Sequence, residues 1–154
     1  MRRICIIFAL TTMGSLAGLW GNEFVSAQHV ANLKINVQYR GEGTVDRGHG
    51  IHIFFFDSPD FTSGNADVIP IAMRTVYENG DSVVLEGLRQ KTVYLAVAYN
   101  ESGDYDPPMG PPPSGTPVAV YRMDDPAAPT PIHLEEGGRL VEVDLVFDDA
   151  NRMP

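Results

Sequence analysis

Residues 80–106 read GDSVVLEGLRQKTVYLAVAYNESGDYD, and the rest of the chain can be arranged around this stretch. Residues 83–88 and 92–99 are rich in β-branched and aromatic side chains, which favour β-strands. The short connection at residues 89–91 predicts that these two strands form a β-hairpin. The second strand then runs into a polar, acidic loop at residues 100–106.

The flanking sequence predicts further short strands. Residues 33–39 and 140–147 alternate apolar and polar side chains, which indicates strands with one buried face. Asn79-Gly80 is a two-residue turn signal that predicts another hairpin, between residues 75–77 and 83–85. Shorter strands are expected within residues 68–76, 118–121 and 132–134, and the first of these begins after Pro70 or lies at a sheet edge.

Residues 51–56, Ile-His-Ile-Phe-Phe-Phe, are apolar on both faces of a strand. Such a run predicts either a central strand covered on both sides or a strand whose outer face forms a dimer interface. No helical periodicity extends over three turns, and turn signals recur about every ten residues. The sequence therefore predicts an all-β fold, an antiparallel β-sandwich of seven or eight strands.

The N-terminus has the features of a secretory signal peptide. Met1-Arg2-Arg3 is basic, the following run is apolar, and Val25-Ser26-Ala27 resembles a small-residue cleavage site. We expect a signal peptide at residues 1–27, with its retention as an anchor as the alternative. A single domain at residues 28–147 and a loose tail at residues 148–154 complete the predicted organisation. The protein is therefore expected to be secreted or periplasmic.

Composition excludes several classes of function. The formal net charge is −9, which is unfavourable for nucleic acid and for anionic membrane surfaces, so neither nucleic-acid binding nor membrane insertion after signal cleavage is expected. Cys5 is the only cysteine and falls inside the predicted signal peptide. The remaining domain is therefore expected to have neither a disulfide nor a thiolate metal site.

The loop that follows residues 92–99 contains the candidate binding residues. Oxygen-bearing side chains alternate along it, which is a spacing found in calcium loops; they are Asn100, Ser102, Asp104 and Asp106. The alternative is ordinary turn chemistry, since the same residue types satisfy backbone groups in loops. Calcium is accordingly the one candidate cofactor.

Residues 100–117 also suggest a surface for a partner. Tyr105 is expected to be exposed beside a proline-rich segment, and an exposed tyrosine next to such a loop is typical of a protein-binding rim. The predicted partner-binding residues are Tyr105, Pro111, Pro112 and Pro113. The partner is expected to be an extracellular or periplasmic protein or polysaccharide.

The sequence offers no clear catalytic motif. His49 and His52 would lie on opposite faces of a strand, His133 is distant in sequence, and the chain contains no Gly-x-Ser-x-Gly motif. Glu142 and Asp144 share one face of a strand that is expected to be solvated. No catalytic residue is predicted, and a small hydrolase is the least favoured alternative to a non-enzymatic accessory or binding module.

The order of strand, Gly87-Leu88, three-residue turn and Tyr-containing strand within residues 80–97 resembles transthyretin-like sandwich modules. These are the carboxypeptidase-regulatory-like and collagen-binding B-type domains of bacterial surface proteins. The following residues 100–106 also resemble those of small secreted bacterial proteins of unassigned function. The turn departs from the family, because Arg89-Gln90-Lys91 replaces Pro-Gly. The resemblance implies a transthyretin-like or immunoglobulin-like sandwich that acts as an extracellular accessory module without a catalytic residue.

Overall fold

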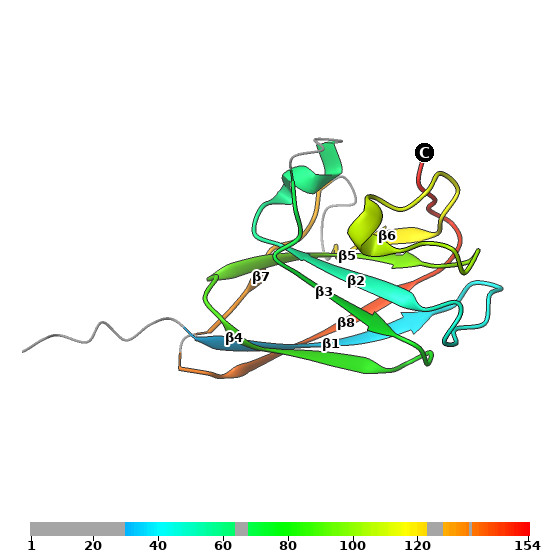
Figure 1. Ribbon diagram of the computed structural model, residues 1–154. Coiled ribbons are helices and arrows are strands. Elements are labelled where there is room, and N and C mark those ends of the chain that lie inside the picture. The colour runs from blue at the N-terminus through cyan, green and yellow to red at the C-terminus, as the bar shows by residue number, and fades with distance from the viewer. Residues whose placement is uncertain (1–29, 64–67, 123–127, 136) are drawn as a thin grey trace, which may run out of the picture.

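The computed structural model describes residues 30–63, 68–122, 128–135 and 137–154, and it shows two β-sheets packed as a sandwich (Figure 1). This confirms the predicted all-β class and the number of strands. The strands are β1 (Ala31–Tyr39), β2 (Ile51–Phe56), β3 (Ala72–Val76), β4 (Ser82–Leu88), β5 (Thr92–Tyr99), β6 (Val118–Val120), β7 (Ile132–His133) and β8 (Leu140–Phe147). Two short 3-10 helices, η1 (Pro59–Ser63) and η2 (Pro107–Met109), lie in the connections.

One sheet has the strand order β4-β1-β8, and the other has the order β3-β2-β5-β6 with β7 also paired to β5. β1 and β8 are parallel, from Asn32 opposite Leu140 to Tyr39 opposite Phe147, which differs from the expected all-antiparallel arrangement. Parallel neighbours need a long crossover connection. Here the other six strands provide it, because β1 and β8 are the first and last strands of the sandwich.

Both predicted hairpins are wrong. β4 pairs with β1 and β5 pairs with β2, so residues 89–91 cross from one sheet to the other. β3 and β4 likewise belong to different sheets, although Gly80 has the positive φ of +84° that suits a tight turn. Asn79 joins this turn to the end of β1, since its side-chain amide donates to the Tyr39 carbonyl (2.7 Å) and its oxygen accepts the Tyr39 N–H (2.8 Å). The chain does turn at both predicted positions, but the two strands that flank each turn belong to different sheets.

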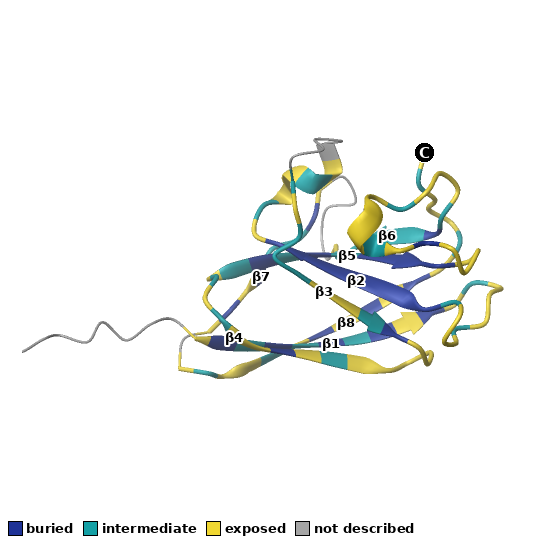
Figure 2. Ribbon diagram, viewed as in Figure 1, coloured by how far each residue is buried: buried dark blue, intermediate teal, exposed yellow. Residues whose placement is uncertain are grey.

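The main core lies between the two sheets, and the predicted alternation of strand faces is confirmed there. Every second residue of β1, β5 and β8 points inward, and these residues are buried except for the half-buried Val141; Figure 2 shows the striped burial pattern. The inward set comprises Leu33, Ile35, Val37, Tyr39, Val93, Leu95, Val97, Tyr99, Val143, Leu145 and Phe147. From β2, Ile51, Ile53 and Phe55 fill the space opposite them.

β2 is buried on both faces along its whole length, which confirms the prediction of a central strand (Figure 2). Its outward residues Phe54 and Phe56 form a second, smaller core with Ala98 and Tyr105. Phe61 of η1 stacks on Phe56 with ring centroids 4.2 Å apart and planes 9° apart. The outer face of the five-stranded sheet is thus covered by η1 and the loop at residues 100–117.

The C-terminal tail differs from the loose segment that the sequence predicted. Met153 exchanges backbone hydrogen bonds with the proline-rich loop, accepting from Gly115 N–H and donating to the Thr116 carbonyl, both at 2.9 Å. Val118 N–H donates to the Asn151 carbonyl at 2.9 Å. Asp149 anchors the start of the tail, because its carboxylate accepts hydrogen bonds from the Tyr39 hydroxyl and the Glu42 N–H. Residues 148–154 therefore support the loop from one side.

The predicted signal peptide, residues 1–27, lies outside the described residues. Among the residues that the structure describes, no helix is long and apolar enough to span a membrane.

Candidate functional site

The loop between β5 and β6, residues 100–117, is held in shape by a buried asparagine. Asn100 follows the last residue of β5, and its side-chain oxygen accepts the N–H of Tyr105 at 3.1 Å while its amide donates to the Tyr105 carbonyl at 3.2 Å. The Tyr105 hydroxyl in turn donates to the Gly110 carbonyl at 3.1 Å. These bonds satisfy buried backbone groups that an irregular loop would otherwise leave unpaired.

The expectation that Tyr105 is exposed is wrong. The residue is only 9% exposed, and it packs on the outward side chains of β2 and β5, including Phe54 and Ala98. The small side chain of Ala98 leaves room for a ring that arrives from the loop. Burial raises the pKa of Tyr105 to about 12, with a smaller contribution from Asp106. The composition of the loop could not reveal this burial, because the side chains that cover the Tyr105 ring belong to β2 and β5.

The exposed part of the loop is its proline-rich rim. Pro111 and Pro113 are exposed and Pro112 is half-buried, so these predicted partner-binding residues do lie at the surface. Met109 on η2 is 85% exposed, the highest fraction among the large apolar side chains of the described residues. Sequence reasoning missed Met109, although an apolar residue among prolines in a loop could have signalled it. We call Met109, Pro111, Pro112 and Pro113 the loop rim.

The predicted calcium ligands serve the backbone of the loop. The oxygens of Asn100 and Ser102 accept the N–H groups of Tyr105 (3.1 Å) and Asp104 (3.2 Å), respectively. Asp104 and Asp106 are exposed. Within the described ranges, no three His, Cys, Asp or Glu side chains are grouped closely enough to hold a metal ion. The arrangement is that of turn chemistry, and calcium binding stays a prediction.

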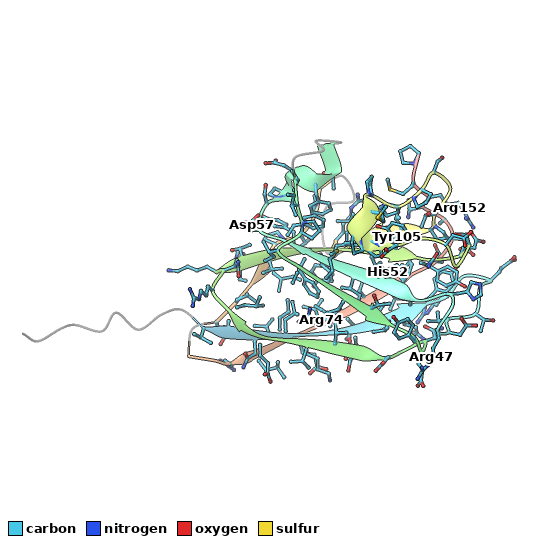
Figure 3. The ribbon with its side chains drawn as sticks, viewed as in Figure 1. Arg47, His52, Asp57, Arg74, Tyr105 and Arg152 are labelled. Carbon is cyan, nitrogen blue, oxygen red and sulfur yellow. The ribbon has the colours of Figure 1, made fainter. Side chains whose placement is uncertain are left out.

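A cavity of about 630 Å³ opens beneath this loop. Its walls come from the loop that precedes β2, from β3 and from residues 100–108. His52 on β2 and Tyr105 on the loop lie next to each other at the cavity (Figure 3), with ring centroids 5.3 Å apart and planes at 87°. Arg47 and Arg74 also line it. Sequence reasoning placed none of these residues at one site, because they come from four separate segments.

His52 is the unusual side chain of the cavity. It is only 8% exposed, and its Nδ1 lies 2.9 Å from Thr75 Oγ1, its cross-strand neighbour on β3. Its Nε2 is buried and has no hydrogen-bond partner among the described residues. Burial lowers the pKa of His52, and the nearby carboxylate of Asp106 opposes this in part. Leaving a buried polar atom unpaired costs about 1–3 kcal/mol.

The other described histidines do not join His52: His49 lies beside Gly103 at the edge of the cavity, and His133 lies far from it. His49 Nδ1 is 2.9 Å from Asp46 in the loop before β2. His133 pairs with Thr92 at one end of β5, whereas His52 pairs with Ala98 near the other end. Six residues of strand separate the two positions, a distance of about 20 Å at the usual rise of a β-strand. The structure therefore places His52 and His133 too far apart to act on one substrate atom.

The two carboxylates of β8 form part of a solvated ladder. Glu142 accepts hydrogen bonds from Lys34 (2.7 Å) and Asn36 (2.9 Å), and Asp144 accepts one from Asn36 (2.7 Å). Both acids are exposed on the outer face of the three-stranded sheet, as the sequence predicted.

No protein-family model, curated protein or solved structure matches this chain. The resemblance to transthyretin-like modules stays a prediction, and a functional assignment depends on the geometry of the loop and its cavity.

Proposed function

We propose that the protein is a secreted or periplasmic β-sandwich module that binds another extracellular component through residues 100–117. The observation that carries this proposal is the combination of a fixed loop backbone with an exposed apolar rim. The apparent signal peptide at residues 1–27 supports the location. The resemblance to transthyretin-like accessory modules supports a non-enzymatic role.

The loop is ordered before any partner arrives. Asn100 holds its first turn, the buried Tyr105 ring attaches it to the sheet, and Met153 of the tail bonds to its last part. Association normally costs free energy for ordering loops, and a preorganised loop avoids much of that cost. Long loops in compact domains are often binding elements for this reason.

The rim has the chemistry of a protein-binding surface. Met109 is a flexible apolar side chain that adapts to irregular partner surfaces, and the neighbouring prolines lose little entropy on contact. Asp104 and Asp106 add negative charge nearby. A partner protein with an apolar patch bordered by basic residues fits this combination better than a polysaccharide does.

Site-specific photocrosslinking in the secreted or periplasmic fraction of the source cells tests this function. A photoreactive residue at position 109 should give a discrete adduct, whereas the same residue at Val84 should not. Val84 is 45% exposed, but it lies on the outer face of the other sheet, so it is a matched control. Equal adducts at both positions, or no adduct at position 109, would contradict the proposal.

A further inference from the structure

We propose that Asn79 is a deamidation site that the turn between β3 and β4 controls: the asparagine is converted to aspartate only while this turn is released from β1. The group that reacts is the side-chain amide of Asn79, the attacking atom is the backbone nitrogen of Gly80, and the co-reactant is water. The reaction needs no partner protein, so the site is independent of the function proposed for residues 100–117.

The side chain of Asn79 extends the hydrogen-bond ladder between β4 and β1. Val37 of β1 donates its N–H to the Asp81 carbonyl and accepts the N–H of Gly80, both at 3.0 Å. Two residues further along β1, the Tyr39 N–H donates to Asn79 Oδ1 at 2.8 Å, and the Tyr39 carbonyl accepts from Asn79 Nδ2 at 2.7 Å. A side-chain amide thus takes the place of a backbone peptide group. A carboxylate cannot do so, because it has no donor.

The turn needs a glycine directly after this asparagine. Gly80 has a φ of +84°, a conformation that favours glycine. Glycine has no side chain, so its backbone nitrogen is unshielded from the side chain of the preceding residue. Asn-Gly is for this reason a sequence prone to deamidation. The conformation of the turn therefore requires a pair of residues that is chemically labile.

Deamidation uses only groups of the turn and one water molecule. The Gly80 nitrogen loses its proton to a base and attacks Cγ of Asn79. The new C–N bond closes a cyclic imide, and the side-chain nitrogen leaves as ammonia. Water then adds to one carbonyl of the imide and opens it. Opening at one carbonyl gives aspartate, and opening at the other gives isoaspartate, in which the backbone runs through the former side chain.

The folded turn withholds both reacting groups. The N–H of Gly80 is bonded to the Val37 carbonyl, and the amide of Asn79 is held by its two bonds to Tyr39. The nitrogen can attack Cγ only after these bonds open. Asn79 and Gly80 are exposed, so water and base reach the turn once it is released. The reaction rate should therefore scale with the fraction of time that the turn is open.

The product cannot restore the same contacts. An ionised aspartate at position 79 has no donor for the Tyr39 carbonyl, and it would bring a carboxylate oxygen against the carbonyl oxygen. Isoaspartate lengthens the backbone of the turn, so the bonds of Gly80 and Asp81 to Val37 would lose their register. Deamidation is thus a one-way change that leaves the end of β1 without its partner.

The first test measures deamidation of the purified full chain at mildly alkaline pH. Trypsin cleavage at Arg74 and Arg89 releases residues 75–89, in which Asn79 is the single asparagine, so mass spectrometry of this peptide follows the reaction. A synthetic peptide of the same residues is the unfolded reference. The folded chain should react at least about tenfold more slowly than the peptide, since three hydrogen bonds must open. Urea should remove the difference. Equal rates in the folded chain and the peptide would overturn the proposal.

Hydrogen exchange at the Gly80 amide tests whether the turn controls the reaction. Exchange and deamidation both need this N–H to be released from the Val37 carbonyl. The amide should therefore exchange at least about tenfold more slowly in the folded chain than in the peptide. Exchange as fast in the folded chain as in the peptide would overturn control by the turn.

Matched variants test whether the change is one-way. Asn79→Asp reproduces one product, and Asn151→Asp makes the same change of charge at an exposed position of the tail. Asn79→Asp should accelerate exchange at the Gly80 amide about threefold to tenfold, since one hydrogen bond is lost. Asn151→Asp should leave that exchange unchanged. Equal exchange in the two variants would overturn the one-way step.

Discussion

The outer face of the three-stranded sheet meets solvent, whereas the outer face of the five-stranded sheet is covered by a second layer of chain. On the first face, Lys34, Asn36, Glu142 and Asp144 form a polar ladder across β1 and β8. On the second face, Phe54 and Phe56 are buried beneath η1 and the loop at residues 100–117.

The difference shows how a site arises from a strand that is apolar on both faces. β1 and β8 alternate, so one cover is enough for them, but β2 needs a second cover to keep its outward rings from water. The irregular loop at residues 100–117 covers part of this face, but it does not fill all the space above the strand. The cavity with His52 is the space that this cover leaves open.

Truncation of the second core should produce the largest effect. Phe56→Ala removes a buried ring that stacks on Phe61, and it should lower the free energy of unfolding by about 3–4 kcal/mol. Val84→Ala, on the solvated face of the other sheet, should cost less than about 1 kcal/mol. Urea denaturation measures both. Similar losses would mean that the two outer faces do not differ in burial.

The next largest effect is expected at the base of the loop. Asn100→Ala leaves the buried N–H and carbonyl of Tyr105 without partners, so it should cost about 1–3 kcal/mol. Hydrogen exchange at the Tyr105 amide should accelerate markedly. Ser102→Ala removes one bond to an exposed amide and should change little. Unchanged exchange in Asn100→Ala would show that the side chain does not hold the loop.

A smaller effect should appear as a dependence of stability on pH. Burial lowers the pKa of His52 from its ordinary value of 6.5, so the unfolded chain takes up this proton at a higher pH than the folded chain does. Stability should therefore fall as the pH drops below 6.5 toward the lower pKa of the folded state. Asp106 is the charged group that acts on the ring, and it raises the pKa of His52 in part; Arg47 and Arg74 also line the cavity, and Arg74 pairs with Ile53 and so leaves β3 on the face opposite His52.

Thermal melts between about pH 7.5 and pH 5 measure this effect. His52→Leu should remove that part of the decrease, whereas His133→Gln, at an exposed position in the same sheet, should not. The lowered pKa values of Asp46 and Asp149 have little influence here, because their ordinary value is 3.8 and stability that depends on them is lost only near and below it. A decrease that persists in His52→Leu would contradict the prediction.

Calcium should have the smallest effect of all. The Asn100 and Ser102 oxygens already accept backbone hydrogen bonds, so we expect the same melting temperature in calcium and in EDTA. A higher melting temperature in calcium, lost in Asp104→Asn, would instead support the calcium-stabilised module.

Much of the fold followed from local pattern. Alternation along residues 33–39 and 140–147 correctly predicted both the strands and their buried faces, and β-branched and aromatic residues correctly predicted the strand at residues 92–99. For the doubly apolar β2, the structure bears out the central strand, one of the two predicted alternatives. The candidate site was predictable only in part. The loop and its exposed prolines were visible in the sequence, but the burial of Tyr105 and the cavity around His52 depend on contacts between distant segments.

The sequence by itself determined which residues form strands and, where apolar and polar residues alternate, which side of the strand is buried, because a period of two residues is a local property of an extended chain. The tertiary structure alone decided which sheet each strand joins. The turns at Gly80 and at residues 89–91 each lead from one sheet to the other. In this arrangement, the inward residues of β4 and β5 face each other across the core between the two sheets. It also decided where the tail and Tyr105 lie, because their partners are far away in the chain.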